Sequence, residues 1–334
     1  MSAIRDLDYL VISARIKALE NRLLSLDELT QILESKTDED AMKILAEAGY
    51  PAFDLRRPEE MNAALESVRR STFNDLADSA PDERYLDIFK IKYDYHNVKA
   101  VLKADALRKS FADTLIDMGR VSAETLVSAV QDGDYSFLPG ALADAVTEAK
   151  EVLATTRDPQ LSDIVLDRAM FSDQLKSAEQ TGSIFLSGYV RLLIDCANLK
   201  ALVRTLRMAK SSEFYESVVC EGGDISPESL IAAARSGGQG LGELFAPTLL
   251  AAASEIGQRV VQADESLTTF ELACDNAVND YLSGALYVAF GEAPLVGFLA
   301  ALETEITNLR IVLMGRNAHL DPATVRSRLR NTYV

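Results

Sequence analysis

Apolar residues recur along most of the chain at spacings of three and four, the period of an amphipathic α-helix. The first such run predicts a long helix from Leu10 to Leu24. Two shorter helices are predicted over 27–34 and 38–48, with acids near their starts, where the helix dipole favours negative charge. Gly49 and Pro51 end the second of them. Runs of β-branched residues bounded by hairpin turns are missing, so the pattern predicts an all-α protein.

One stretch, residues 281–302, is apolar enough to resemble a membrane-spanning helix, which needs about 20 such residues. Glu292 interrupts it, and a charge at the centre of a bilayer costs about 2.5 kcal/mol or more. Pro294 would also kink a continuous helix. We therefore expect two buried helices that meet at the sequence GEAP (291–294), and no insertion of this chain into the membrane.

Three segments share one pattern, which we call the signature. It has an acid, an asparagine three residues later and a base five residues later, with aliphatic residues four, seven and eight after the acid. The segments read DYHNVKAVLKA (94–104), DCANLKALVRT (195–205) and EITNLRIVLMG (305–315). Their acids and asparagines are Asp94 and Asn97, Asp195 and Asn198, and Glu305 and Asn308.

The signatures are 101 and 110 residues apart, a spacing that suits a small domain used three times. We therefore predict three similar helical domains over 1–114, 115–220 and 221–334. The first two signatures are each followed by a glycine and then a serine that can cap a helix, Ser122 and Ser226. After the third, Asp321 can cap a helix that starts at Pro322.

Each signature places a polar pair on a packed helix. At 100° per residue, the acid shares a face with the aliphatic positions, and the bases point away from that face. A buried acid and asparagine must be hydrogen-bonded, so we interpret each pair as a structural tie to a neighbouring segment. The alternative is a binding or catalytic carboxylate, and catalysis would need an open cleft and a raised pKa. His96 does not favour catalysis, because Ala and Thr take its place in the other signatures.

The net charge of −17 and the pI of about 4.6 disfavour nucleic acid or an anionic membrane surface as partners. Lys200, Arg204 and Arg207 form a basic stripe, which continues to Lys210. Such a stripe is usually a solvated face, and the alternative is contact with an acidic partner or with the chain's own acids. The third signature has Met314 where the second has Arg204, so the three basic faces are not equivalent.

Motifs of known chemistry are missing from the sequence. Its three cysteines form no CxxC pair, and no zinc-protease, nucleophile-elbow or calcium-loop motif occurs. The glycine-rich stretch SGGQGLG (236–242) has neither the GK[ST] nor the preceding strand of a phosphate loop. The first 20 residues lack the pattern of a signal peptide. We expect a cytoplasmic protein with no catalytic residues, no metal site and no cofactor.

The segments that carry the signature also carry a resemblance. KYDYHNVKAVLKA (92–104), IDCANLKALVR (194–204) and above all GEAPLVGFLAALETEITNLRIVLMGR (291–316) resemble the C subunit of bacterial and archaeal V/A-type rotary ATPases. The family includes the d subunit of eukaryotic vacuolar ATPases. ARIKALENRLLS (14–25) and RSRLRNTYV (326–334) are similar to the start and the end of its members, while residues 105–165 match only in outline.

The resemblance implies three helical domains around a pseudo-threefold axis, arranged as a funnel. It further implies a non-catalytic rotor subunit that caps the membrane c-ring (the proteolipid ring) on its cytoplasmic side and receives the central shaft, built from the D and F subunits. It implies no nucleic acid partner and no cofactor. The rival hypothesis is a helical adaptor or scaffold outside the rotary ATPases.

Overall fold

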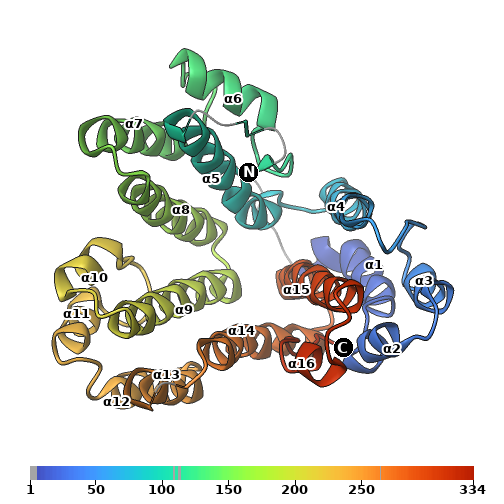
Figure 1. Ribbon diagram of the computed structural model, residues 1–334. Helices are drawn as coiled ribbons and strands as arrows, with labels where there is room; N and C mark the ends of the chain where they lie inside the picture. Colours follow the sequence, from blue (N-terminus) through green and yellow to red (C-terminus); the bar gives the residue numbers. More distant parts are fainter. Residues whose placement is uncertain (1–5, 108–109, 112–113, 264) are drawn as a thin grey trace. The chain divides into compact units, whose positions relative to one another are not determined.

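The computed structural model describes residues 6–107, 110–111, 114–263 and 265–334. The elements of these ranges are α-helices and short 3-10 helices joined by turns, and no strand occurs among them (Figure 1). The all-α prediction is confirmed.

Contacts between residues group the chain into two compact units, one built from both ends of the chain (Met1–Glu83 and Thr248–Val334) and one from its middle (Arg84–Pro247). Unit 1 contains η1 (Asp6–Tyr9), α1 (Leu10–Glu20), α2 (Leu26–Glu34), α3 (Asp38–Glu47), α4 (Pro58–Ala77), α13 (Ala251–Ala263), α14 (Leu267–Ser283), η3 (Gly284–Tyr287), α15 (Glu292–Asn317) and α16 (Pro322–Arg326). Unit 2 contains α5 (Arg84–Leu107), α6 (Ala123–Asp132), α7 (Gly140–Thr156), α8 (Pro159–Thr181), α9 (Ile184–Arg207), α10 (Ser212–Val218), α11 (Pro227–Arg235) and α12 (Leu241–Phe245).

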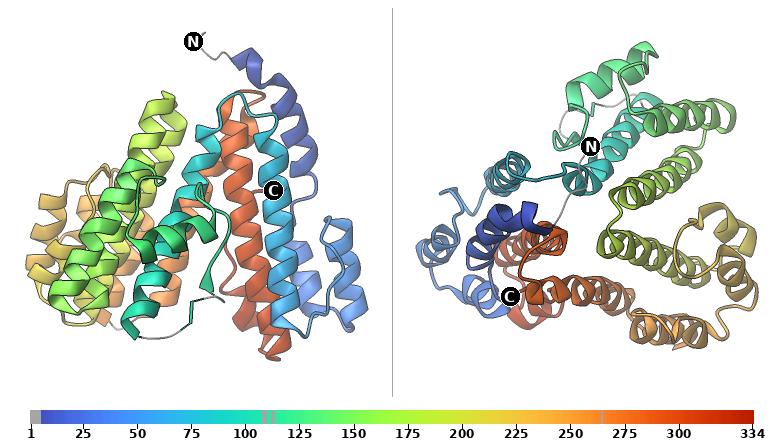
Figure 2. Two further views of the ribbon diagram at one scale, coloured as in Figure 1. Left: turned by 90° about the horizontal axis from the view of Figure 1, so that it is seen from above. Right: turned by 180° about the vertical axis from the view of Figure 1, so that it is seen from behind.

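Helix α15 forms the centre of unit 1. It packs against α1, α2, α4 and α14. Figure 2 shows α1, α2 and α4 beside it. Its residues 293–302 are all buried, so this part of the helix is apolar on every face, as a helix enclosed by others must be. The later part of the apolar run that resembles a membrane span, residues 293–302, is therefore part of the core of unit 1, while residues 287–290 before it are exposed.

Helix α8 holds unit 2 together. It packs against α5, α7 and α9, which lie around it in Figure 1. The fully buried Leu166 and Ala178 lie on α8, and Tyr95 of α5 and Tyr215 of α10 are among the largest side chains of this core. Burying a side chain of this kind contributes about 1.5–3 kcal/mol, so the apolar spacing of the sequence is sufficient reason for these helices to associate.

Several helices begin and end at the residues that the sequence indicated. The Ser122, Ser226 and Asp321 side chains accept hydrogen bonds from the first turns of α6, α11 and α16. Helix α3 ends at Glu47, shortly before Gly49, whose φ of 95° lies in the left-handed region that favours glycine. These local signals work because each cap contacts only its own helix.

Two predictions about helix ends had different outcomes. The expected junction at GEAP is confirmed, since α14 and η3 end before it and α15 begins at Glu292, with Pro294 in its first turn. The expected first helix is too long, because α1 ends at Glu20 and not at Leu24. The backbone N–H of Leu24 is instead bonded to Glu305, far along the chain.

Candidate functional site: the three signature helices

The three signatures lie on α5, α9 and α15, and their asparagines make the same pair of hydrogen bonds. Asn198 donates to the carbonyl of Cys220 at 2.8 Å and accepts from the N–H of the same residue at 2.8 Å. Asn97 does this with Ile116 at 2.8 and 2.9 Å, and Asn308 with Arg330 at 3.0 and 3.0 Å. Each asparagine amide thus binds both the backbone N–H and the carbonyl of one residue that lies about 20 positions downstream.

The acids of the first two signatures hold the backbone a few residues further on. Asp94 accepts from the N–H of Val121 at 3.2 Å, and Asp195 accepts from the N–H of Ile225 at 3.2 Å and of Asp224 at 2.9 Å. Arg120 adds an ion pair to Asp94 at 2.8 Å. A buried carboxylate is stabilised by such charge-assisted donors.

Glycine allows this close approach. A Cβ atom on Gly119 would lie 2.1 Å from the Asp94 Oδ1 atom, and one on Gly223 would lie 2.1 Å from the Asp195 Oδ1 atom. In the third signature the acid, Glu305, is one methylene longer than aspartate. The position that corresponds to the two glycines, two residues before the backbone N–H that Glu305 binds, is occupied by Arg22. The pairing of aspartate with glycine therefore has a geometric cause in two of the three signatures.

Glu305 takes its donors from the start of the chain. Its two oxygens accept from the N–H of Leu24 at 2.5 Å and from the Tyr50 hydroxyl at 2.6 Å. Leu24 directly precedes Ser25, the cap of α2, just as Val121 precedes Ser122 and Ile225 precedes Ser226. Each signature acid therefore holds the residue before the cap of a short helix, and for α15 that helix is α2.

The correspondence expected between Asp321 and the two cap serines needs correction. Asp321 caps α16 as predicted, with its carboxylate accepting from the N–H of Thr324 at 3.0 Å. However, Asp321 lies 13 positions after Asn308, and Ser211, the cap of α10, lies 13 positions after Asn198. Asp321 therefore corresponds to Ser211. The counterpart of Ser122 and Ser226 is Ser25, which local sequence around the third signature could not indicate.

Sequence reasoning missed Leu24, Tyr50 and Arg120, and it noted a glycine after each of the first two signatures without the contact that requires it. A signal for the first was present: LSLDEL (24–29), VSAETL (121–126) and ISPESL (225–230) share an apolar residue, a serine, an acid and a final leucine. That leucine is completely buried in all three helices, as Leu29, Leu126 and Leu230. The sequence offers no comparable signal for Tyr50, because this residue lies in a loop, outside any repeated pattern, and contributes a single hydroxyl.

All six signature residues are buried, with exposures of 6% or less. Burial raises the pKa of Asp195 to about 6 and that of Glu305 to about 7, against the lowering effect of their hydrogen bonds. Catalysis would require substrate to reach these carboxylates, and their oxygens are occupied by backbone N–H groups, the Arg120 guanidinium and the Tyr50 hydroxyl. These contacts support the structural interpretation of the signatures, which stays a prediction.

The basic positions of the signatures differ in their surroundings. On α5, Lys99 and Lys103 pair with Asp167 and Asp163 of α8, each at 2.5 Å. On α15, Arg310 donates to Asn62 at 3.2 Å, and the Met314 side chain is 54% exposed. On α9, Arg204 is exposed while Lys200 and Arg207 are half-buried.

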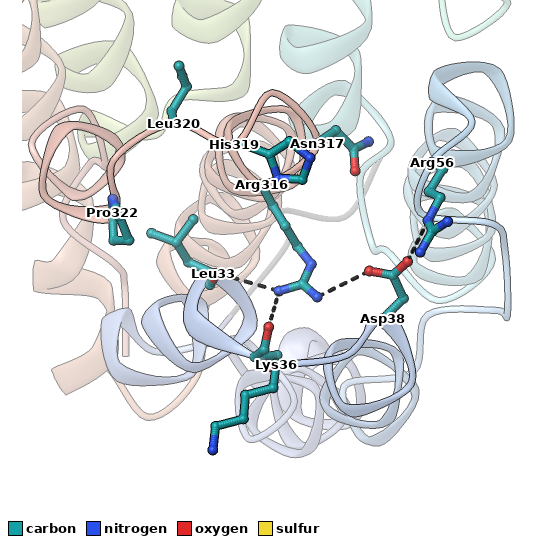
Figure 3. Close-up of a pocket in the computed structure, with 10 residues that line it drawn as sticks. Leu33, Lys36, Asp38, Arg56, Arg316, Asn317, His319, Leu320 and Pro322 are labelled. Atoms are coloured by element: carbon teal, nitrogen blue, oxygen red, sulfur yellow. Dashed lines mark hydrogen bonds and ion pairs between the residues drawn. The ribbon is translucent and has the colours of Figure 1, made fainter.

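A cavity of about 690 Å³ in unit 1 lies where α2 and α15 end (Figure 3). The Arg316 guanidinium at its centre donates to the carbonyls of Ile32 at 3.3 Å and Ser35 at 2.5 Å, and to Asp38 at 3.1 Å. A cation is favourable at a helix C-terminus, so Arg316 stabilises the end of α2. Arg316, followed by Arg56, lowers the pKa of Asp38.

Two further kinds of site do not occur in the described ranges. No three His, Cys, Asp or Glu side chains there are grouped as a metal site requires. A helix with the length and hydropathy needed to cross a membrane is likewise absent from the part of the chain that the structure describes.

Comparison with known proteins gives the class to which this architecture belongs. The ATP synthase (C/AC39) subunit family matches residues 12–328, nearly the whole chain. The chain belongs to this family, and the resemblance found in its signatures is thereby confirmed.

Named relatives cover the chain almost completely. The C subunit of the V-type sodium ATPase of Enterococcus hirae is 26% identical over 332 residues, which are 98% of this chain and 99% of that protein. The C subunit of the A-type ATP synthase of Methanocaldococcus jannaschii is 24% identical, covering 96% of this chain and 86% of the relative. That of Haloferax volcanii is 26% identical, with 95% of both chains covered.

Proposed function

We propose that this protein is the non-catalytic C subunit in the rotor of a V/A-type ATPase or ATP synthase, where it couples the central shaft of the D and F subunits to the membrane c-ring. The family match over residues 12–328 carries the proposal. In this role the chain lies on the cytoplasmic side of the membrane and attaches through the complex. The relatives' names include both a sodium ATPase and ATP synthases, so the proposal concerns the coupling and not the ion or its direction.

The architecture supports this role through stiffness. A part that passes torque between two others must not deform, and packed helices with few voids transmit strain well. Each signature asparagine makes two hydrogen bonds to one residue, and each acid fixes the entry to a short helix. These ties prevent the long helices from shifting register against the segments that follow them.

The proposed arrangement is three similar helical bodies around a pseudo-threefold axis, with a mouth for the foot of the shaft. Equivalent hydrogen bonds at the three signatures support this arrangement. The predicted domain boundaries follow residues 114 and 220. The signature residues of α5 and α9 bind backbone groups at or beyond these boundaries, between Ile116 and Val121 and between Cys220 and Ile225. Those boundaries stay a prediction.

The test is co-migration with a purified D–F pair during size-exclusion chromatography, at two salt concentrations. We expect a stable ternary species whose yield falls with salt if charged groups contribute to binding. ATP hydrolysis by this chain alone is expected to equal the buffer background. Separate elution at both salt concentrations, also in the presence of detergent-solubilised c-ring, would favour the adaptor hypothesis.

A further inference from the structure

The cavity of about 690 Å³ in unit 1, where α2 and α15 end, is lined by more bases than acids (Figure 3). Its charged side chains are those of Lys36, Arg56 and Arg316, with Asp38 as the one acid. With histidine counted as neutral, the lining therefore has an excess of two positive charges. The whole chain has 34 bases and 51 acids, so the cavity has the opposite sign to the molecule around it, which favours an anion there.

The chain's own acids leave this excess in place. Two guanidinium groups share the single carboxylate of the lining, since Arg316 donates to Asp38 at 3.1 Å and the Arg56 Nε atom donates to it at 2.9 Å. Two further acids lie next to lining residues in the sequence, and both are occupied. Glu34 is paired with Arg326, a base outside the lining, and Asp321 accepts from the backbone at the start of α16.

Several donors of the lining are without a partner. Within the part of the chain that the structure describes, the side chains of Lys36 and His319 make no hydrogen bond and no ion pair. Arg56 uses only its Nε atom there, so its two terminal amino groups are likewise unbonded. Lys36 extends away from Arg316 in Figure 3, and its flexible stem allows the ammonium group to turn toward a bound anion.

His319 is positioned by the turn that ends α15. Its φ of 52° is left-handed, and the N–H groups of His319 and Leu320 donate to the carbonyls of Arg316 and Gly315, each at 3.0 Å. Helix α9 ends with the same turn at Ala209, whose φ is 51° and which follows its signature asparagine by the same 11 positions. The turn itself therefore does not require histidine, and the imidazole can donate to a ligand.

We propose that this cavity binds a small soluble molecule that carries a phosphate group. Near pH 7 a phosphate monoester has a charge of about −1.5 to −2 and three acceptor oxygens, which match the two excess positive charges and the unbonded donors of Lys36, Arg56 and His319. A monocarboxylate would compensate only one of these charges. The organic part of the ligand would contact the apolar side chains of Leu320 and Pro322 in the lining.

A lipid surface fits this site less well, because a bilayer is bound by a broad cationic face, whereas these bases surround one cavity. The site involves no covalent step. It lies outside the proposed coupling between shaft and ring, which does not require it.

The test is isothermal titration calorimetry of the full chain with inorganic pyrophosphate, and with acetate for comparison. We expect pyrophosphate to bind with a dissociation constant of about 1 mM or lower and to bind more weakly as salt is added. The double variant Lys36→Gln, Arg56→Gln should weaken binding at least about tenfold, since each change removes a charged donor. His319→Ala, which gives α15 the residue of α9, should weaken it about threefold. Arg316 is left unchanged because it also holds the end of α2.

The matched control removes two exposed bases of unit 1 that do not line the cavity, through Lys43→Gln and Arg328→Gln, and should leave binding within about twofold. Thermal unfolding gives a second measurement: pyrophosphate should raise the Tm of wild type and of the control, and not that of the Lys36→Gln, Arg56→Gln variant. The same curves show that each variant is folded.

The proposal is overturned if wild type does not bind pyrophosphate at about 10 mM, if the double variant binds it as well as wild type, or if acetate binds equally. Sedimentation with vesicles that contain phosphatidic acid tests the lipid source, and co-sedimentation without pyrophosphate binding would also overturn it. Co-migration of the double variant with the D–F pair should equal that of wild type, so failure of this site and failure of the rotor role are distinguishable.

Discussion

At the scale of single residues, two of the signatures depend on glycines whose missing side chain leaves room for a carboxylate. The Asp195 carboxylate occupies the space that a side chain on Gly223 would fill, and Asp94 does the same beside Gly119. Both aspartates are buried and bonded to backbone N–H groups there. A displaced carboxylate would lose these donors while remaining away from water, which is costly.

Gly223→Ala should therefore destabilise the protein by about 2–4 kcal/mol. The added Cβ would lie 2.1 Å from the Asp195 Oδ1 atom and 2.8 Å from its Cγ atom, so the carboxylate must move. Gly140→Ala is the control, because nothing lies within 4 Å of its Cβ position at the start of α7. Urea denaturation followed by circular dichroism measures both. Equal stabilities for the two variants would show that the close approach is not needed.

At the scale of elements, the sequence predicts what lies within one helix and its caps. The start of α11 was predictable because Ser226 and Pro227 act on the adjacent backbone. The early end of α1 was not, since the N–H of Leu24, in the segment expected to be helical, is bonded to Glu305, 281 positions away. Nor could the role of Tyr50 be read from its surroundings. The candidate site was predictable in its residues, through repetition, and not in its partners.

Glu305 links α15 to Leu24, just before α2, and to Tyr50, just after α3. The stability that this link contributes should depend on pH. Burial raises the pKa of its carboxyl to about 7, above the usual value near 4.5. Groups that face it are the Tyr50 hydroxyl, the Leu24 N–H and, through its charge, Glu28. The folded state binds the proton more tightly than the unfolded state, so this contribution is complete below about pH 4.5 and is lost as pH rises through about 7.

We expect the stability of wild type, relative to Glu305→Gln, to fall by about 3 kcal/mol as pH rises through this window. The glutamine does not titrate, so the difference between the two proteins isolates this group from the other acids. Denaturation curves collected between about pH 5.5 and about pH 8 would give most of the change. A difference that stays constant over that range would mean that Glu305 remains ionised in the folded protein.

At the scale of the whole molecule, the two ends of the chain build one unit and the middle builds the other. Unit 1 takes its central helix from the end of the sequence and α2 from its start, joined by the bonds of Glu305. Unit 2 contains the signatures of α5 and α9, and α8 packs against both of those helices. Because each unit has its own buried core, we expect each to open separately.

Hydrogen exchange on a matched pair of variants tests this. Asn308→Leu and Asn198→Leu each remove two hydrogen bonds to one peptide residue, so each should cost about 2–4 kcal/mol. We expect Asn308→Leu to speed exchange by about 30-fold or more in 6–83 and 248–334, and Asn198→Leu to do so in 84–247. Faster exchange across both units in either variant would mean that the chain opens as a single cooperative body.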